Sequence, residues 1–519
     1  MTEGIWGART FCELLERRAA LTPDAPMLFD EHDRRLTFAE FAEWVDRAAA
    51  GLYELGVRES TPVAWQLPTR MESVVLSFAL SRLGAVQSPI IALYRDREVG
   101  FVIRQANADF VFVPGVWRGF DYPAMIDRLA VDHPPNVVVA YDELPEGDPA
   151  TLPPPPPLVD AAQSPQRWVY YTSGTTSDPK GVLHTDATLL AGGEAMARVL
   201  PMGPHDVGSI AFPFAHVAGP DYIVSMLVQG FPSVLFESFV PAESIPIYNR
   251  YGVTMAGGST AFYVALLNEQ RKQPGRPLIP TLRVMSGGGA AKPPEIYFEA
   301  KAEMGCVVQH GYAMTECPMS AFNPPEATEE QLAYTEGPAV PGCHIDIVRA
   351  DGTPADAGEE GEVRVWGTML YKGYSDPALD TDAFDEEGRY RTGDLGSLRP
   401  DGYLNITGRL KDIIIRKGEN ISARDVEDAL YAHPKVGDVV VIGLPDRERG
   451  ERVCAVVEPA PGAEPITFDE MVAWCEAAGL MRQKIPEQLV IDPHMPRNMS
   501  LNKVLKYKLR EQLRDVPWP

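Results

Sequence analysis

Residues 172–181, with the sequence TSGTTSDPKG, combine groups that can hold a polyphosphate. Hydroxyl and backbone N–H groups donate hydrogen bonds to phosphate oxygens, and glycine lets the main chain approach them closely. The segment is not a Walker A motif, because that motif requires Gly-Lys-Ser/Thr, whereas Lys180 precedes Gly181 and Val182. We expect a phosphate site unlike that of P-loop NTPases; on composition alone, a flexible turn is the alternative. The candidate residues are Thr172, Ser173, Gly174, Thr175, Thr176 and Lys180.

Four later motifs carry groups suited to a nucleotide: SGGGA at 286–290, GYAMTE at 311–316, YRTGDLG at 390–396 and GRLKD at 408–412. An aromatic ring can stack on a base, and carboxylates can hold Mg²⁺ or accept hydrogen bonds from a diol. Each motif alone has a plainer interpretation: Tyr312 as a core residue, the glycines as a tight turn, the charged residues as a solvated loop.

Taken in order, these motifs resemble those of the adenylate-forming superfamily, which includes acyl-CoA synthetases, luciferases and peptide-synthetase adenylation domains. The resemblance implies that Tyr312 stacks on adenine, Thr315 touches the α-phosphate and Glu316 holds Mg²⁺. It also implies that Asp394 binds the ribose hydroxyls and that Arg409 contacts ribose or phosphate. Further implied nucleotide-site residues are Gly288, Gly289, Gly311 and Lys411.

Residues 496–503, PRNMSLNK, resemble the loop that carries the family's adenylation lysine, which would be Lys503. Its ammonium could bridge the substrate carboxylate and the α-phosphate and stabilise the charge that develops during attack. The segment departs from the family pattern, because Asn502 replaces the customary glycine and one extra residue precedes the lysine. Lys506 and Lys508 are neighbouring alternatives.

The resemblance implies two reactions at one nucleotide site. The acid's carboxylate first attacks the α-phosphorus of ATP and pyrophosphate leaves; the small domain then turns about Lys411 and admits a thiol. Residues 417–421, KGENI, match the loop that borders the pantetheine channel, where Gly418 gives the thiol room. The implied catalytic residues are Thr172, His216, Glu316 and Lys503.

His216 bears on the choice of acid. Peptide-synthetase domains usually place an aspartate at this position to hold an amino group, so amino acid activation is disfavoured. His216 resembles the histidine of acyl- and aryl-CoA synthetases, with a core histidine as the plainer alternative. By resemblance, residues 257–259 and 287–289 line the acyl pocket, and the lack of bulky side chains there implies a wide pocket, which favours a bulky apolar acid: fatty, aromatic or alicyclic.

The sequence therefore predicts an AMP-forming acid–CoA ligase that uses ATP, Mg²⁺ and coenzyme A. Coenzyme A is favoured as acceptor because the chain ends soon after Lys503 without a carrier domain. The alternatives are transfer of the acyl group to a separate carrier protein, oxidation as in luciferases, and nucleotide binding without activity. The sequence does not indicate an oligomeric state, so a homodimer is neither predicted nor excluded.

Composition and net charge disfavour several classes of protein. A formal charge of -25, from 47 basic and 72 acidic side chains, lacks the positive field that nucleic acid binding needs. The six cysteines are scattered without metal-site spacing, which fits a reducing cytoplasm. No leader-like segment and no apolar run of membrane-spanning length is visible, so neither export nor a membrane span is expected.

The elements that must position these groups follow from hydrophobic patterning. A helical pattern at 38–55 alternates with short apolar runs at 74–80 and 110–113, which predicts layered α/β structure. Residues 168–171 predict a buried strand that leads into the phosphate segment. The Pro-rich stretch 146–165 predicts a surface connector.

The C-terminal part shows a different pattern. Strands are predicted at 361–370 and 403–415, with a hairpin turn at Asp401-Gly402, then a helix at 423–432 and a strand at 439–442. A chain of 519 residues is too long for one compact core. We predict a large domain, 1–410, and a small domain, 411–519; by resemblance, the first has layered α/β subdomains with a distorted β-barrel and the second is a mobile α+β unit.

Overall fold

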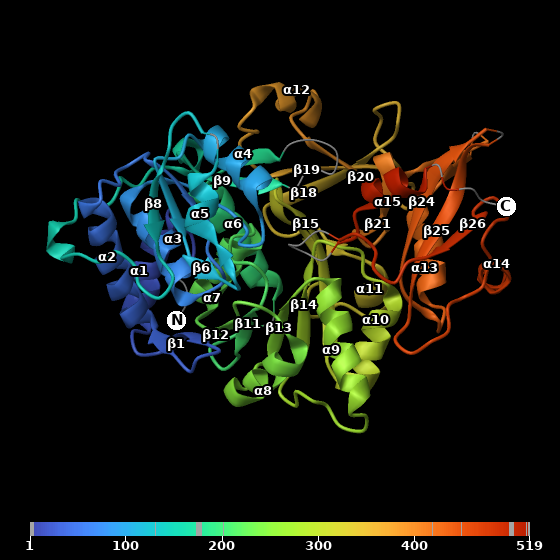
Figure 1. The fold of residues 1–519 in the computed structure, drawn as a ribbon, viewed down its shortest axis with the longest axis horizontal. Coiled ribbons are helices and arrows are strands. Elements are labelled where there is room, and N and C mark those ends of the chain that lie inside the picture. The colour runs from blue at the N-terminus through green and yellow to red at the C-terminus, as the bar shows by residue number, and fades with distance from the viewer. Residues whose placement is uncertain are drawn as a thin grey trace.

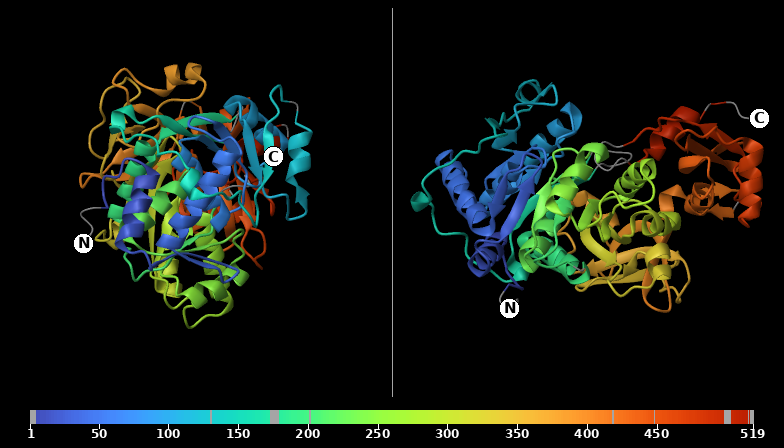
Figure 2. Two further views of the ribbon diagram at one scale, coloured as in Figure 1. Left: turned by 90° about the vertical axis from the view of Figure 1, so that its left-hand side faces the viewer. Right: turned by 90° about the horizontal axis from the view of Figure 1, so that it is seen from below.

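The computed structural model describes residues 5–129, 131–172, 179–200, 202–417, 419–447, 449–497, 503–514 and 516. Figure 1 shows the N-terminal elements at one end and the C-terminal elements at the other. Seen from below (Figure 2, right), the middle of the chain lies between these two ends. The site candidates of the sequence must therefore meet where these parts adjoin.

A six-stranded sheet forms the first layer and carries the phosphate segment at one edge. Its strand order is β10-β9-β4-β3-β5-β8, and all pairs are parallel except the hairpin of β9 and β10. Alternate residues face opposite sides, so Val63 and Trp65 join one core cluster and Ala64 joins another. The strands are β3 (Pro62–Trp65), β4 (Val86–Pro89), β5 (Phe110–Val113), β8 (Asn136–Val139), β9 (Gln166–Thr172) and β10 (Lys180–Thr185).

Helices cover both faces of this sheet. Thr37 and Glu40 form a capping box that starts α2, as the pattern at 38–55 predicts. Residues of α4 and α5 pack on one face, and those of α1, α2, α3, α6 and α7 pack on the other. The helices are α1 (Phe11–Leu21), α2 (Phe38–Glu54), α3 (Met71–Leu83), α4 (Asp96–Ala106), α5 (Tyr122–Asp127), α6 (Asp186–Val199) and α7 (Ala218–Gln229).

The apolar run 74–80 lies inside helix α3, whereas its length and composition had indicated a strand-like segment. The helix is buried on nearly every side, so its sequence lacks the polar stripe that would reveal a helical period. The Pro-rich stretch forms a surface connector as predicted: it holds two short 3₁₀ turns, and Arg82 on α3 donates a hydrogen bond to the Pro153 carbonyl at 3.0 Å.

Two four-stranded sheets form the middle of the molecule. One has the order β11-β12-β1-β2, and the other has the order β13-β14-β15-β16 with its first three strands parallel. Helices α8 to α11 pack on one face of the second of these sheets (Figure 1). The strands are β1 (Pro26–Asp30), β2 (Arg35–Thr37), β11 (Gly208–Ile210), β12 (Ser233–Leu235), β13 (Met255–Gly258), β14 (Val284–Gly288), β15 (Val307–Met314) and β16 (Cys317–Phe322). The helices are α8 (Pro241–Tyr251), α9 (Thr260–Lys272), α10 (Pro294–Glu299) and α11 (Glu329–Tyr334).

An antiparallel sheet, β17-β21-β20-β19-β18, follows. The predicted hairpin turn is confirmed: Gly402 adopts φ +82° between β20 and β21. The short helix α12 (Asp380–Ala383) and the two-residue strands β6 (Val116–Trp117) and β7 (Phe120–Asp121) lie outside the main sheets. The strands of the antiparallel sheet are β17 (Gly337–Pro338), β18 (Cys343–Val348), β19 (Gly361–Gly367), β20 (Tyr390–Leu398) and β21 (Tyr403–Arg409).

The C-terminal part has its own sheet and its own core clusters. Strand pairing changes between Arg409, which ends β21, and Ile414, which begins β22. The predicted helix at 423–432 and strand at 439–442 are present as α13 and the longer β24. Its elements are β22 (Ile414–Arg416), β23 (Glu419–Ile421), α13 (Ala423–Tyr431), β24 (Val436–Asp446), β25 (Gly450–Pro459), α14 (Phe468–Ala477), β26 (Gln488–Ile491) and α15 (Lys506–Leu513). Among the helices in the described part of the chain, none combines the length and the apolar character needed to cross a membrane.

Candidate active site

A cavity of about 520 Å³ opens where the ends of β9, β10, β14, β15 and β20 meet. It brings together predicted residues from segments more than 200 positions apart in the chain. Ser173, Gly174, Thr175, Thr176 and Gly418 lie outside the described residues. The predicted residues that line the cavity are Thr172, Lys180, His216, Gly288, Gly289, Gly311, Tyr312, Thr315, Glu316, Asp394, Arg409 and Lys411.

Glycines let the strands that form one wall come close together. A Cβ on Gly287 would lie 1.6 Å from the carbonyl oxygen of Gly258, and one on Gly288 would lie 2.7 Å from that of Gly311. Gly289 adopts φ +80°, which turns the chain at the end of β14. The wall of the cavity is therefore main chain at this point.

The hairpin of β9 and β10 positions the ends of the phosphate segment, because Thr172 pairs with Lys180 across it. Residues 372–375 run along the outer edge of β10, where the Ser375 N–H donates to the Gly181 carbonyl at 2.7 Å. The ring of Tyr374 thereby lies 5.0 Å from Lys180 Nζ. A lysine and an aromatic ring thus stand together at the cavity wall.

Tyr374 also holds Glu316, since its hydroxyl donates to Glu316 Oε1 at 2.7 Å. The hydroxyls of Tyr374 and Tyr390 lie 3.2 Å apart. Burial and the nearby Glu316 carboxylate raise the pKa of both phenols, so they remain donors at neutral pH. Tyr374 was missed by sequence reasoning, because no local motif marks it; Tyr390 stands in the YRTGDLG motif and could have been assigned.

Behind the site, His184 supports Thr315. Its Nε2 lies 2.8 Å from the Thr315 carbonyl oxygen, and its Nδ1 lies 2.9 Å from Thr188 Oγ1. Burial lowers the pKa of His184 to about 4, so the ring is neutral and carries its proton on Nε2 to serve the carbonyl. His184 is a positioning residue that the sequence did not reveal.

Asp394 is held at the junction of β20 and β21. The Tyr312 hydroxyl donates to its Oδ2 at 2.5 Å, and Arg409 Nε lies 2.7 Å from its Oδ1. Burial, followed by the nearby carboxylate, raises the pKa of Tyr312 well above its ordinary value. Tyr312 is thereby anchored at its hydroxyl end, with the ring in the cavity wall.

Lys503 lines a second cavity of about 570 Å³, which shares Tyr312, Asp394 and Arg409 with the first. The side chain is exposed to solvent, yet the surrounding walls remove enough water to lower the pKa of its ammonium to about 8. Arg409 and Lys411 lower this pKa further by repulsion, and Asp394 opposes them. Lys503 therefore belongs to the same electrostatic cluster as Asp394.

The deep end of the first cavity is apolar. His216 borders it, and burial lowers the pKa of His216 to about 4, so the ring is neutral there. Tyr222 presents its ring, while its hydroxyl accepts a hydrogen bond from Ser233 at 3.5 Å. Other apolar side chains that line this cavity include Met196, Leu200, Phe212, Val217, Phe262, Met319 and Phe322.

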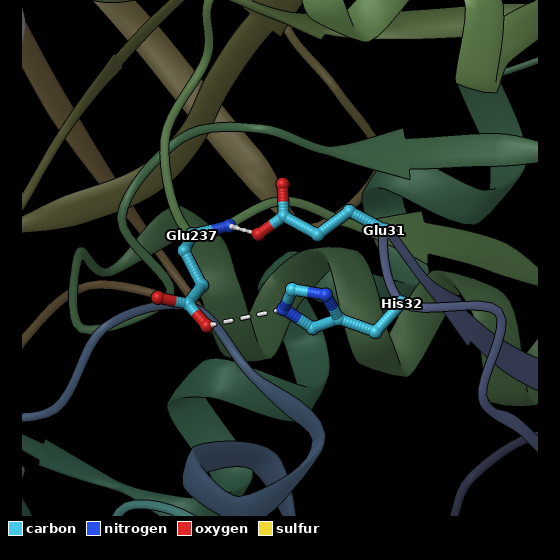
Figure 3. A group of neighbouring side chains, drawn as sticks. All are labelled: Glu31, His32 and Glu237. Atoms are coloured by element: carbon cyan, nitrogen blue, oxygen red, sulfur yellow. Dashed lines mark hydrogen bonds and ion pairs between the residues drawn. The ribbon is translucent and has the colours of Figure 1, made fainter.

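Glu31, His32 and Glu237 form a separate group with potential metal-binding atoms, shown in Figure 3. His32 Nε2 lies 3.8 Å from Glu237 Oε1, and the Glu237 N–H donates to Glu31 Oε1 at 3.3 Å. Both carboxylate oxygens of Glu237 already accept hydrogen bonds, one from the Arg70 guanidinium and one from Trp117 Nε1. Because Arg70 already supplies the compensating positive charge, we assign no metal to this group.

Comparison with known proteins identifies the family of this chain. The AMP-binding enzyme family matches residues 15–375, and the AMP-binding enzyme C-terminal domain matches residues 425–501. The medium-chain fatty-acid–CoA ligase of Escherichia coli is 30% identical over 525 residues, which cover 98% of this chain and 92% of that protein. The salicyl-AMP ligase / salicyl-S-ArCP synthetase of Mycobacterium tuberculosis is 32% identical over 535 residues, with 98% and 92% covered.

Solved structures agree with the fold expected from the sequence. ATP-bound MatB from Rhodopseudomonas palustris has a TM-score of 0.85 at 25% identity, over 96% of this chain and 99% of that one. The o-succinylbenzoate CoA synthetase MenE of Bacillus subtilis, in complex with ATP and magnesium ion, has a TM-score of 0.81 at 27% identity, with 96% and 99% covered. The α/β fold with a separate C-terminal domain is thus confirmed, and the chain belongs to the AMP-binding enzymes of the adenylate-forming superfamily, the family of the acid–CoA ligases.

Proposed function

We propose that this protein is an AMP-forming acid–CoA ligase for an apolar carboxylic acid. It would convert ATP and the acid to an acyl-adenylate and pyrophosphate, and then the acyl-adenylate and coenzyme A to a thioester and AMP. One observation carries the proposal: a single cavity is lined both by the charged residues Lys180, Glu316 and Asp394 and by a group of apolar side chains. An anionic nucleotide and an apolar acid would therefore lie side by side.

For the nucleotide, we assign the Tyr312 ring to adenine and the Asp394 carboxylate to the ribose hydroxyls. A carboxylate can accept two hydrogen bonds from a diol, and the ion pair with Arg409 holds the Asp394 carboxylate in place. Thr315 would contact the α-phosphate, in a position secured by His184. Lys180, with the segment 172–176, would hold the outer phosphates.

Glu316 fits Mg²⁺, because a carboxylate oxygen is a preferred ligand of this hard cation and Glu316 lines the same cavity as Lys180. Bound there with the phosphates, the ion would neutralise charge on the phosphate oxygens. The hydrogen bond from Tyr374 orients the carboxylate, and Lys180 balances the remaining negative charge.

In the first step, a carboxylate oxygen of the acid attacks the α-phosphorus, a new C–O–P linkage forms, and the bond to pyrophosphate breaks. We assign to Lys503 the task of bridging the carboxylate and the α-phosphate, since its ammonium offsets the repulsion of two anions. Its proximity to Asp394 and Arg409 supports this role. Thr172 would donate a hydrogen bond to the phosphates.

In the second step, the coenzyme A thiol attacks the activated carbonyl carbon, the thiol proton is lost and AMP leaves. We propose that residues 411–519 rotate about Lys411 relative to residues 1–410, which brings the loop around Gly418 to the acyl group. His216 lines the same cavity with a neutral ring whose Nδ1 accepts from the Ala218 N–H at 3.3 Å, so we assign it to the wall along which the thiol would approach, and the thiol proton would pass to solvent.

The acid is proposed to be fatty, aromatic or alicyclic. Among the described residues that line this cavity, the charged side chains are Lys180, Glu316, Asp394, Arg409 and Lys411. We assign them to the nucleotide end, so the apolar part offers no partner for a second carboxylate or an amino group. The sequence similarity to the fatty-acid–CoA ligase of Escherichia coli agrees with such a substrate.

Transfer of the acyl group to a carrier protein is the second candidate. It is favoured by the similarity to the Mycobacterium tuberculosis salicyl-AMP ligase / salicyl-S-ArCP synthetase and to the 2,3-dihydroxybenzoate-AMP ligase of Bacillus subtilis, which is 29% identical. The two candidates share the first step and differ only in the thiol that takes the acyl group.

The test is a panel of apolar acids with ATP, Mg²⁺ and coenzyme A, assayed for thioester and for AMP. We expect thioester and AMP in equal amounts for at least one acid, and no ADP. Acid-dependent pyrophosphate exchange without any thioester would favour the carrier-protein alternative. No exchange with any acid would contradict both.

A second experiment tests the assignment of Lys503. Lys503→Ala is expected to lower acid-dependent pyrophosphate exchange about 100-fold or more, because the positive charge at the reacting atoms is lost. Thioester formation from a supplied acyl-adenylate should fall far less. Equal losses in both steps would refute the role, and Lys508→Ala serves as the matched control on the neighbouring helix.

A further inference from the structure

An ion pair crosses from helix α13 of the C-terminal part to the large N-terminal part. Arg424 Nη2 lies 3.3 Å from Glu336 Oε1, and the two side chains are 16% and 9% exposed. Glu336 Oε2 accepts a second hydrogen bond, from the Ile406 N–H at 3.0 Å. Beside the pair, Ser422 donates to the Thr407 carbonyl at 2.7 Å. Helix α13 is thus tied to the large part through a partly desolvated charge pair.

The pair exists only in the present orientation of the two parts. Arg424 belongs to the segment proposed to rotate, whereas Glu336 precedes β17 of the large part. A rotation about Lys411 would withdraw the guanidinium and leave the Glu336 carboxylate behind. Withdrawing the guanidinium from a buried carboxylate is unfavourable, so the pair opposes the rotation.

Lys292 provides a second positive charge near Glu336. Its Nζ donates to the Ala333 carbonyl at 2.7 Å and is almost fully buried. Burial lowers the pKa of Lys292 to about 8. The nearby Glu336 carboxylate raises this pKa in part, and the Arg424 guanidinium lowers it further. Removing Arg424 from its neighbourhood would therefore favour the charged form of Lys292, which can then compensate Glu336.

We propose that the Arg424–Glu336 pair is a latch that holds the C-terminal part in the orientation in which Lys503 faces Asp394 and Arg409. This inference rests on the proposed function, because the orientation matters only if adenylation and thioester formation need different positions of the small domain. Arg424 is thus a positioning residue for the first step; it does not touch the reacting atoms.

The kinetic test compares the two half-reactions in Arg424→Gln. Loss of the latch should lower kcat for acid-dependent pyrophosphate exchange about five- to tenfold, because the population of the adenylation orientation falls. Thioester formation from a supplied acyl-adenylate should be unchanged or faster. Arg424→Lys, which keeps the charge, should restore most of the exchange rate. Equal losses in both half-reactions, or no loss in either, would overturn the latch.

Lys484→Gln is the matched control. Lys484 pairs with Asp425, which lies on helix α13 like Arg424, but both partners of this pair belong to the C-terminal part. It should weaken a helix α13 ion pair without altering the ratio of the two half-reactions. A change in that ratio as large as for Arg424→Gln would show that any damage to helix α13 suffices, and would overturn the proposal.

A measurement independent of activity separates failure of the latch from failure of the proposed function. The six native cysteines are buried, so spin labels can be directed to Lys272→Cys on α9 and Met481→Cys after α14, both exposed. Pulsed dipolar spectroscopy should give one dominant distance for the labelled parent chain and a broader distribution once Arg424→Gln is added. An unchanged distribution would overturn the latch even if the parent is active, whereas absence of exchange in the parent contradicts only the proposed function.

Discussion

At the scale of single residues, the nucleotide site is preassembled around Asp394, which accepts from the Tyr312 hydroxyl and pairs with Arg409. Replacing Asp394 with Asn removes the charge that strengthens hydrogen bonds to ribose and leaves Arg409 without its partner. We expect the KM for ATP in pyrophosphate exchange to rise about tenfold or more. Tyr312→Phe keeps the ring and should raise the KM for ATP by no more than about threefold. A larger effect from Tyr312→Phe than from Asp394→Asn would contradict the ribose assignment.

The pKa of Lys503 predicts a pH dependence. Its ammonium loses a proton with a pKa of about 8, below the ordinary value for lysine, so the side chain is charged below that pH and neutral above it. Because adenylation needs the charged form, kcat/KM for ATP should fall as pH rises through about 8. The pH profile of pyrophosphate exchange checks this. In Lys503→Arg, whose side chain stays charged, the remaining activity should not fall in this range; the same fall there would assign the titration to another group.

At the scale of elements, the site depends on how closely strands β13, β14 and β15 approach. In Gly287→Ala, a Cβ would lie 1.6 Å from the Gly258 carbonyl oxygen and 2.7 Å from the Tyr263 hydroxyl, so the strands would have to separate. We expect a loss of about 2 kcal/mol or more in the free energy of unfolding, measured by chemical denaturation. Gly203→Ala, with nothing within 4 Å of the added methyl, should be close to neutral. Equal stabilities would show that the strands can separate at little cost.

Local sequence patterns predicted some helices and strands correctly and failed for others. The strand at 168–171 was predictable because a short apolar run leads into a loop of small residues. The helix at 423–432 was predictable because its buried residues, Ala423, Val426 and Leu430, recur on one face. The run 74–80 was not, because α3 is buried on nearly all sides and its composition does not separate helix from strand. The long antiparallel strand β24 begins earlier and ends later than its apolar core suggested.

At the scale of the whole molecule, segments from residue 172 to residue 503 converge on two adjoining cavities. The overall charge of -25 does not oppose nucleotide binding there, because Lys180, Arg409, Lys411 and Lys503 gather at the cavity walls. If residues 411–519 move as proposed, part of this positive charge would move with them.

The sequence by itself determined the family, the order of the motifs and the residues that carry polar chemistry, because short motifs combine residue type with a local backbone shape. Only the tertiary structure decided which of these residues meet, and it added partners that no motif marks: Tyr374 against Glu316, His184 behind Thr315, and Arg424 across from Glu336. These contacts join residues that are far apart in the chain, and their energy comes from burial and charge pairing. Neither property can be read from a residue's neighbours in sequence, since both arise only when distant segments exclude water together.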